Sequence, residues 1–237
     1  MGKAWWLCLC FGGAGSTPSP IVGAGSTPSP IVLFPLGAPD ETTTIGNETT
    51  IDGRVYNVSI PELYPYLSPT PNCAVIVAPG GGYDDVSITK EGFQVADALL
   101  DLGLSVFVLK YRVPARPPQP DKPKWWAPLE DAQRALSYVR ANYDFKVIGF
   151  LGFSAGANLA VHLSTAYSPR VYAPTDQIDN VSSRPDFAAA LYPWEIIDDD
   201  GALAPEVDNV TSRTPDCFLV HAVDDGTAPY QNSITYF

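Results

Sequence analysis

The chain has 237 residues, of which 46% are hydrophobic and 17% are charged, and this is an ordinary composition for one α/β domain with a buried core. The formal net charge of -12 argues against nucleic acid or an anionic membrane surface as a partner, because both would repel an acidic surface.

The first 32 residues have the pattern of a signal peptide followed by a linker. Lys3 precedes an apolar run from Ala4 to Phe11, and small residues follow, which is the order found in secretory signals. The segment GAGSTPSPIV then occurs twice in succession, and its composition cannot supply a packed core. We therefore expect a folded domain over residues 33–237. No other stretch approaches the roughly 20 apolar residues of a membrane span.

Glycosylation sequons are more frequent than expected. Their acceptors are Asn47, Asn57, Asn180 and Asn209. Ordinary composition gives roughly one or two such sequons by chance. The excess favours a secreted, extracellular glycoprotein.

Short apolar runs alternate with helical patterns along the rest of the chain. The expected strands are Arg54–Ile60, Ala74–Pro79, Leu104–Arg112, Val147–Phe153, Phe187–Pro193 and Cys217–Val223. Helices are expected over Thr89–Gly103, which ends at a glycine, and from Pro128 to Tyr143, which begins with a proline. This alternation predicts a mainly parallel sheet with helices on both faces. Functional sites in such sheets lie at the carboxyl ends of the strands.

The cysteines give a weaker signal. Cys8 and Cys10 lie in the expected signal peptide, and Cys73 and Cys217 each open a buried strand. Those two strands should be separated by two others, about 14 Å, whereas a disulfide needs Cα atoms within about 7 Å. We therefore expect Cys73 and Cys217 to be free thiols.

A serine stands at the turn of a strand-turn-helix segment, VIGFLGFSAGANLAVHL, within the motif G-x-S-x-G. Gly152 and Gly156 leave room for a strained turn that raises Ser154 Oγ above the sheet, close to a helix N-terminus. The motif alone is a weak signal, but the apolar strand before it and the small-residue helix after it are the context that it requires. Ser154 is therefore the expected nucleophile.

A nucleophilic serine in acyl transfer also needs donors for the oxyanion. The segment APGGGYDD follows an inner strand, and its glycines let the backbone approach a substrate closely. It has the position of the HGGG-type loop of esterases, with Pro79 in place of the histidine. We assign Gly81 and Gly82, together with the Ala155 amide, to the oxyanion hole. The alternative is a plain glycine turn or an anion-binding nest.

The acid of a triad on this architecture follows the serine in the chain, and the histidine follows the acid. Asp224 and Asp225 stand in a turn after the last expected strand. We favour Asp225 and expect Asp224 to be solvated. Glu195, which follows the preceding strand, is a second candidate, although a solvated carboxylate is the better interpretation.

No suitable base is found. The chain has two histidines, and both precede Asp225. His162 lies eight residues beyond Ser154 on the same helix, about 12 Å along the axis, which rules out a hydrogen bond to Oγ. His221 lies two strands away, nearly 10 Å laterally, and is better explained as a strand histidine that supports the acid turn.

Taken together, the chain from Leu33 to Phe237 resembles the α/β-hydrolase esterases of the acetyl-xylan esterase and bacterial feruloyl-esterase type, near the dienelactone-hydrolase-like enzymes. The segments that carry the resemblance are LFPLGAP, VAPGGGYDDVSITKEGFQVA, VFVLKYRVP, PLEDAQRALSYVR, GFLGFSAGANLAVHL, RPDFAAALYP and TPDCFLVHAVDDGTAPYQNS. The resemblance implies Ser154 as nucleophile, Asp225 as acid and Gly81, Gly82 and Ala155 as oxyanion donors.

The family also places its catalytic histidine in a glycine-rich loop after one more helix and strand. That region is absent here, and the stretch from Trp194 to Thr214 is short for the family. We therefore expect a C-terminally incomplete α/β-hydrolase whose last helix and strand are missing.

The expected function is that of a serine carboxylesterase acting on acyl esters, acetyl foremost, of polysaccharides. Its partners are a small ester or an acylated polysaccharide, and neither a metal nor an organic cofactor is implied. A peptidase or lipase on the same fold is an alternative, since fold does not fix substrate. The other alternative is a catalytically inactive relative, because this chain lacks the base.

Overall fold

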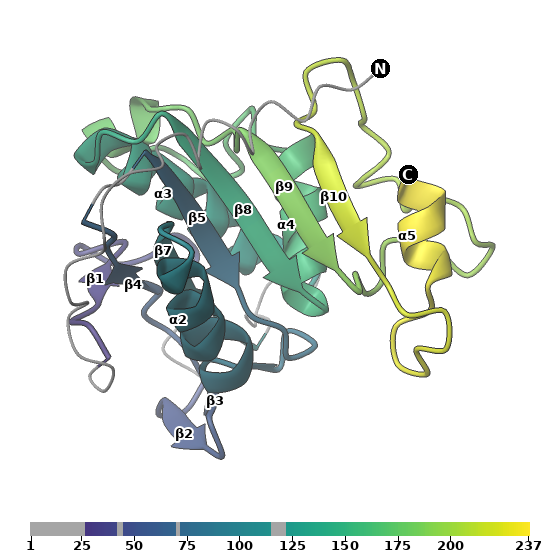
Figure 1. Cartoon of the computed structure of the whole chain (residues 1–237), viewed down its shortest axis with the longest axis horizontal. Helices are drawn as coiled ribbons and strands as arrows, with labels where there is room; N and C mark the ends of the chain where they lie inside the picture. The colour runs from purple at the N-terminus through teal and green to yellow at the C-terminus, as the bar shows by residue number, and fades with distance from the viewer. Residues whose placement is uncertain (1–26, 42–44, 70–71, 115–121) are drawn as a thin grey trace.

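The computed structural model describes residues 27–41, 45–69, 72–114 and 122–237, so the expected signal peptide lies outside the described residues. Its centre is a seven-stranded sheet in the order β1-β4-β7-β5-β8-β9-β10 (Figure 1). These strands are β1 (Ile31–Val32), β4 (Glu62–Tyr66), β7 (Ser105–Lys110), β5 (Cys73–Ala78), β8 (Val147–Phe153), β9 (Phe187–Leu191) and β10 (Cys217–Val220). The strands from β7 to β10 in this order run parallel, whereas β1 and β4 are antiparallel to their neighbours.

Helices cover both faces of the sheet. They are the π-helix η1 (Thr89–Phe93), α2 (Gln94–Asp101), α3 (Trp126–Asn142), α4 (Ala155–Thr165), the 3-10 helix η2 (Gln177–Asn180) and α5 (Gln231–Tyr236). Helix α2 lies in front of the sheet in Figure 1, and α3 and α4 lie behind it. This arrangement confirms the expected α/β fold with a mainly parallel sheet.

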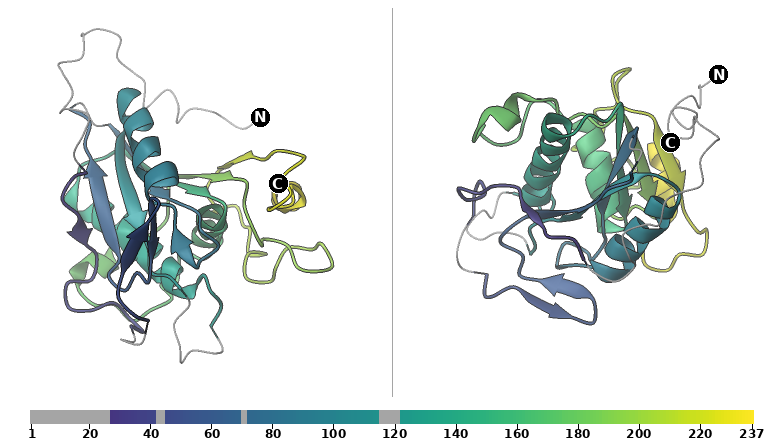
Figure 2. Two further views of the ribbon diagram at one scale, coloured as in Figure 1. Left: turned by 90° about the horizontal axis from the view of Figure 1, so that it is seen from below. Right: turned by 60° about the vertical axis from the view of Figure 1, so that its left-hand side comes forward.

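A second, three-stranded sheet joins β2 (Thr49–Ile51), β3 (Arg54–Tyr56) and β6 (Asp85–Val86) in that order. Strand β6 follows the glycine loop at the carboxyl end of β5, so the small sheet lies at that end of the large one. The C-terminal segments lie at the other edge of the molecule from β1 (Figure 2).

The central strands form where the sequence is continuously apolar. All residues of β5 and β7 are buried, because strands and helices surround them. Each fully buried Val, Ile, Leu or Phe side chain contributes roughly 1.5–3 kcal/mol.

Several boundaries differ from those expected. Strand β4 escaped prediction because Pro65 interrupts its pattern, yet it pairs antiparallel with β7. The expected strand at Arg54 ends at Tyr56, and the last strand ends at Val220. The last two residues of the second GAGSTPSPIV repeat, expected to be linker, form strand β1 (Ile31–Val32), which pairs with β4.

The cysteine prediction is half right. Strands β5 and β10 are separated by β8 and β9, as expected, and Cys217 is a free thiol. Cys73 is disulfide-bonded, so the expectation of a free thiol there is wrong. The strand argument excluded only a bond between Cys73 and Cys217.

None of the described helices is both long enough and apolar enough to cross a membrane.

Candidate active site

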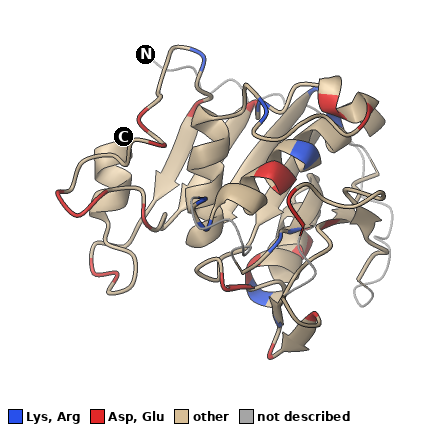
Figure 3. Cartoon of the chain, turned by 180° about the vertical axis from the view of Figure 1, so that it is seen from behind, with Lys and Arg blue, Asp and Glu red and all other residues tan. Residues whose placement is uncertain are grey.

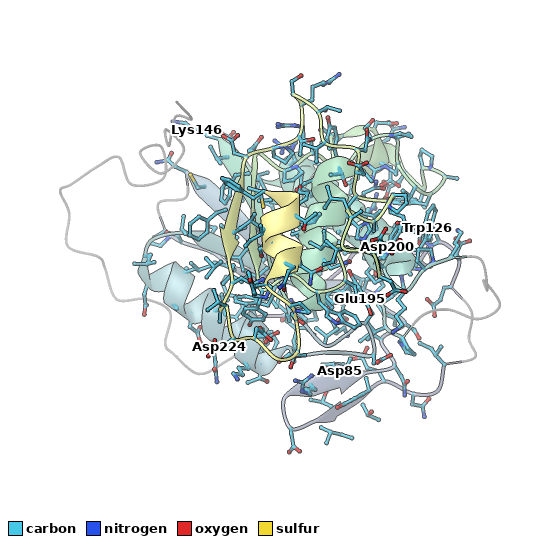
Figure 4. All side chains as sticks on the ribbon, turned by 90° about the vertical axis from the view of Figure 1, so that its right-hand side faces the viewer. Asp85, Trp126, Lys146, Glu195, Asp200 and Asp224 are labelled. Carbon is cyan, nitrogen blue, oxygen red and sulfur yellow. The ribbon has the colours of Figure 1, made fainter. Side chains whose placement is uncertain are left out.

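The carboxyl ends of the parallel strands meet at one end of the molecule. Figure 4 shows Asp85, Glu195 and Asp224 at this end, whereas Lys146, which precedes β8, lies at the opposite end. A cavity of about 440 Å³ opens here. It is lined by Arg54, Gly81, Gly82, Glu91, Ser154, Tyr192, Trp194, Asp225, Thr227 and Ala228.

Ser154 stands at the sharp turn between β8 and α4. Its φ of 52° and ψ of -116° place a non-glycine residue in a conformation that costs about 1–3 kcal/mol. The backbone holds it there, because the Ser154 amide donates to the Leu191 carbonyl at 3.0 Å and the Ser154 carbonyl accepts from the Asn158 amide at 3.0 Å. The turn therefore has the strained geometry of a nucleophile elbow.

The two glycines of the motif are required by close backbone contacts. A Cβ on Gly152 would lie 1.9 Å from the Gly156 carbonyl oxygen, and a Cβ on Gly156 would lie 2.0 Å from the Ala78 carbonyl oxygen. No side chain fits at either position. The glycines thus let α4 begin directly against the ends of β5 and β8.

The glycine loop after β5 lies beside Ser154. Gly81 and Gly82 adopt φ values of 142° and 63°, which favour glycine. Among the described residues, no hydrogen bond uses the amides of Gly81, Gly82 or Ala155 as donors. The three amides predicted for the oxyanion hole are therefore unengaged next to the serine.

The third glycine of the loop, Gly80, is hydrogen-bonded to Glu91. The Oε2 atom of Glu91 accepts from the Gly80 amide at 2.7 Å, so this amide is not available to a substrate. Its Oε1 accepts from the Tyr192 hydroxyl at 3.2 Å. A Cβ on Gly80 would lie 2.8 Å from Glu91 Oε2 and 2.9 Å from Ser154 Cβ, so the carboxylate and the serine flank the same glycine.

Asp225 lines the same cavity as Ser154, from the turn after β10. Its Oδ1 accepts from the amides of Thr227 and Ala228, at 2.8 and 2.9 Å. These amides, together with His221, lower the pKa of Asp225 below its ordinary value. Asp225 is thus a fixed, ionised carboxylate at the mouth of the cavity. Asp224 and Glu195 are exposed and do not line it.

His162 is buried away from the cavity. Its ring stacks on Trp125 with 4.0 Å between centroids, and its Nδ1 has no hydrogen-bond partner. Burial lowers its pKa to about 3. A ring that is neutral and enclosed in this way cannot take the Ser154 proton, as the helix geometry predicted.

His221 supports the turn that carries Asp225. Its Nε2 lies 2.7 Å from the Ala228 carbonyl oxygen, and its Nδ1 lies 2.8 Å from Ser233 Oγ. Because a carbonyl only accepts, Nε2 donates to Ala228, and Nδ1 shares a hydrogen bond with the Ser233 hydroxyl. Asp225 Oδ2 is 3.9 Å from Nε2. Both ring nitrogens are therefore engaged within the C-terminal segment.

Six cavity residues were not found from the sequence: Arg54, Glu91, Tyr192 and Trp194, and Thr227 and Ala228 of the turn that follows Asp225. Tyr192 and Trp194 follow β9, so the rule that sites lie at the carboxyl ends of parallel strands could have found them. Glu91 and Arg54 reach the cavity from η1 and the small sheet, which no local pattern connects to Ser154.

Charge does not mark the site. Acidic residues are spread over loops and helices around the molecule rather than gathered in one part of it (Figure 3). Within the described ranges, no group of three or more His, Cys, Asp or Glu side chains is placed to hold a metal ion.

Comparison with known proteins gives the family. The chain is similar to the crystal structure of an acetyl ester-xyloside bifunctional hydrolase from Caldicellulosiruptor lactoaceticus, with 31% identity and a TM-score of 0.64, over 90% of this chain and 82% of that one. The chain belongs to the α/β-hydrolase esterases of the acetyl xylan esterase type. The resemblance read from the sequence is thereby confirmed.

Other relatives of this esterase family agree. An acetylxylan esterase from Xylanibacter ruminicola is 32% identical over 125 residues, which are 51% of this chain and 22% of that protein. The chain thus matches less than a quarter of that relative's length. An alpha/beta hydrolase from a Medee basin deep-sea metagenome library is 27% identical with a TM-score of 0.55, over 79% of this chain and 72% of that one. No family model matches the chain.

Proposed function

We propose that this esterase-family protein is a serine ester hydrolase that removes acyl groups, acetyl foremost, from polysaccharides. The observation that carries the proposal is the elbow serine, which shares a cavity with a fixed carboxylate and adjoins unengaged backbone amides. The names of two relatives, an acetylxylan esterase and an acetyl ester-xyloside hydrolase, support the substrate class.

The proposed reaction has two halves. Ser154 Oγ attacks the ester carbonyl, and the amides of Gly81, Gly82 and Ala155 stabilise the negative charge on its oxygen. A histidine base takes the Ser154 proton and gives it to the leaving alcohol, which departs as the acyl-enzyme forms. Water activated by the same base then releases the acid and restores the serine. Asp225 orients the base and stabilises its charged form.

The base is the one group that this chain does not place. His162 is enclosed, and His221 is engaged at both nitrogens. We therefore propose that neither of these two histidines is the base. The 237-residue chain alone should turn over esters slowly, since loss of a triad member costs several orders of magnitude in rate.

Chemical rescue tests this proposal on the chain as it exists. Hydrolysis of 4-nitrophenyl acetate is measured with and without added imidazole, which supplies a mobile base beside Asp225. We expect imidazole to raise the enzyme-dependent rate by about tenfold or more, since a general base contributes roughly 10²–10⁴-fold when it is held in place. Ser154→Ala should abolish this increase, and Asp225→Asn should reduce it.

The same experiment decides the second candidate, an inactive relative with a binding role. The absence of a placed base among the described residues favours that candidate. An imidazole effect that is the same in Ser154→Ala as in the unaltered chain would support the inactive relative and contradict the esterase proposal.

We also propose that the protein is secreted and glycosylated. Asn47, Asn180 and Asn209 are exposed and Asn57 is half-buried, so the acceptors lie at the surface. Expression in a eukaryotic secreting host should give protein in the medium that loses mass on treatment with an N-glycosidase. Retention in the cells, or an unchanged mass, would contradict the proposal.

A further inference from the structure

Some residues that line the cavity take no part in the proposed ester hydrolysis. Trp194 and Arg54 both line the cavity that contains Ser154, and neither is needed for acyl transfer. Their side chains bring an indole ring and a guanidinium group to the same opening.

The backbone around Trp194 is strained on both sides. Tyr192 and Glu195 have φ values of 43° and 51°, which residues other than glycine rarely adopt. Such strain persists only where the surroundings hold it, and it gathers at functional sites. The strained residues flank Trp194, which lines the cavity.

A buried amide holds this segment. Asn158 on α4 is 1% exposed, and its Nδ2 donates to the carbonyls of Trp194 and Glu195, at 2.8 and 2.9 Å. Its Oδ1 accepts from the hydroxyl of Tyr83, the residue after Gly82, at 2.7 Å. Lys124 Nζ lies 5.5 Å from the Trp194 ring centroid, within the range of a cation–π contact. The backbone that carries the indole is therefore fixed before any ligand arrives.

Arg54 supplies hydrogen-bond donors. Its Nη1 donates to Asp85 Oδ1 at 2.7 Å, and its side chain is 45% exposed. A guanidinium has five N–H donors, and the Asp85 bond is the one side-chain bond of Arg54 found among the described residues. The ion pair fixes the group and leaves other donors facing solvent.

This combination selects the kind of ligand. An aromatic face with polar groups beside it suits a ring that has an apolar C–H face and hydroxyls around its rim. An anion would meet Glu91 and Asp225 in the same cavity, and a purely apolar group would bury these charges unpaired. A neutral pyranose can pack its C–H face on the indole and form hydrogen bonds with the polar groups through its hydroxyls.

We infer that Trp194 and Arg54 form a sugar-binding subsite that holds the pyranose from which Ser154 removes its acyl group. The inference rests on the proposed ester hydrolysis, but binding of an unacylated sugar requires no turnover. The subsite therefore stands or falls by a separate measurement.

Calorimetric titration of the 237-residue chain with xylotetraose tests the subsite. We expect saturable binding, weakened about tenfold or more in Trp194→Ala and several-fold in Arg54→Gln. Trp126→Phe is the matched control, because Trp126 lies on α3 and does not line the cavity. The circular dichroism spectrum shows that each variant is folded.

Two outcomes would overturn the subsite. One is the absence of xylotetraose binding at 20 mM, and the other is equal binding by the unaltered chain, Trp194→Ala and Arg54→Gln. Tighter binding of tetragalacturonate than of xylotetraose would show that the subsite selects acidic rather than neutral sugars. None of these results changes the imidazole-rescue assay with 4-nitrophenyl acetate, so failure of the subsite and failure of the esterase proposal are distinguishable.

Discussion

At the scale of single residues, His162 couples the stability of the fold to pH. Its pKa falls from 6.5 to about 3 on burial, so the unfolded chain takes up a proton in this range and the folded chain does not. Stability rises with pH wherever the unfolded state binds more protons. The contribution of His162 is therefore complete above pH 6.5 and is lost as the pH falls toward 3, by up to about 1.4 kcal/mol per pH unit.

Urea unfolding of the unaltered chain and of His162→Phe tests this coupling. Phenylalanine keeps a planar ring against Trp125 and removes the titration. We expect the unaltered chain to lose more stability between pH 7 and pH 5 than the variant does. Parallel pH profiles would show that His162 is protonated in the fold or is accessible to water.

At this scale the sequence predicted the turn that carries Ser154 better than the surroundings of that turn. Ser154 and the glycines around it were found because one short motif encodes a strained turn. Trp194 was missed because its place depends on the Asn158 side chain, which meets it across the fold. Contacts between residues 36 apart leave no local pattern.

Between elements, the approach of α4 to β5 and β8 depends on Gly156. A methyl group at this position would lie 2.0 Å from the Ala78 carbonyl oxygen, and both partners are backbone. We expect Gly156→Ala to destabilise the protein by about 3 kcal/mol or more, at or beyond the upper end of ordinary overpacking, because the helix must shift.

Gly226→Ala is the control for this substitution. Gly226 has nothing within 4 Å of an added Cβ. The thermal unfolding midpoint of the Gly226→Ala protein, measured by circular dichroism, should match that of the unaltered chain. A Gly156→Ala protein that unfolds at the same temperature as Gly226→Ala would show that α4 does not need this close contact.

A buried ion cluster joins the segment after β7 to α3. Arg112 is 0% exposed, its Nη2 donates to Glu130 Oε2 at 2.7 Å, and its Nε donates to Asp131 Oδ1 at 2.9 Å. Arg112→Met would remove the guanidinium that both buried carboxylates contact, and we expect a loss of about 3–5 kcal/mol in urea unfolding.

The exposed pair of Lys122 and Asp40 is the comparison, with a distance of 2.6 Å and side chains 33% and 38% exposed. Lys122→Met should cost about 1 kcal/mol or less, because solvent already screens the pair. Equal losses in the two variants would mean that burial adds nothing to the Arg112 cluster.

The elements themselves were predictable where both faces are buried. Strands β5, β7 and β8 agree with their predicted runs to within two residues at each end, since a continuous apolar run has few other uses. Strands β4 and β6 were not predictable, because a proline and a two-residue length hide them from local patterns.

For the whole molecule, the outer edge of the sheet and the net charge act against each other. Among the described residues, β10 pairs on one side alone, with β9, and Phe218 and Val220 are 57% and 43% exposed. An apolar edge strand with unpaired backbone groups favours pairing with a second chain. The net charge of -12 repels that second chain.

Salt should decide between these two effects. The screening length falls from about 30 Å at 0.01 M to about 8 Å at 0.15 M salt, so repulsion between chains weakens while the edge is unchanged. We expect sedimentation velocity to show self-association that increases with salt and protein concentration. Phe218→Lys should reduce it by charging the edge, whereas Leu102→Lys, at a residue that is 60% exposed at the end of α2, should not reduce it, because an added lysine away from the edge only lowers the net negative charge. Equal association of the two variants would mean that the β10 edge does not control association.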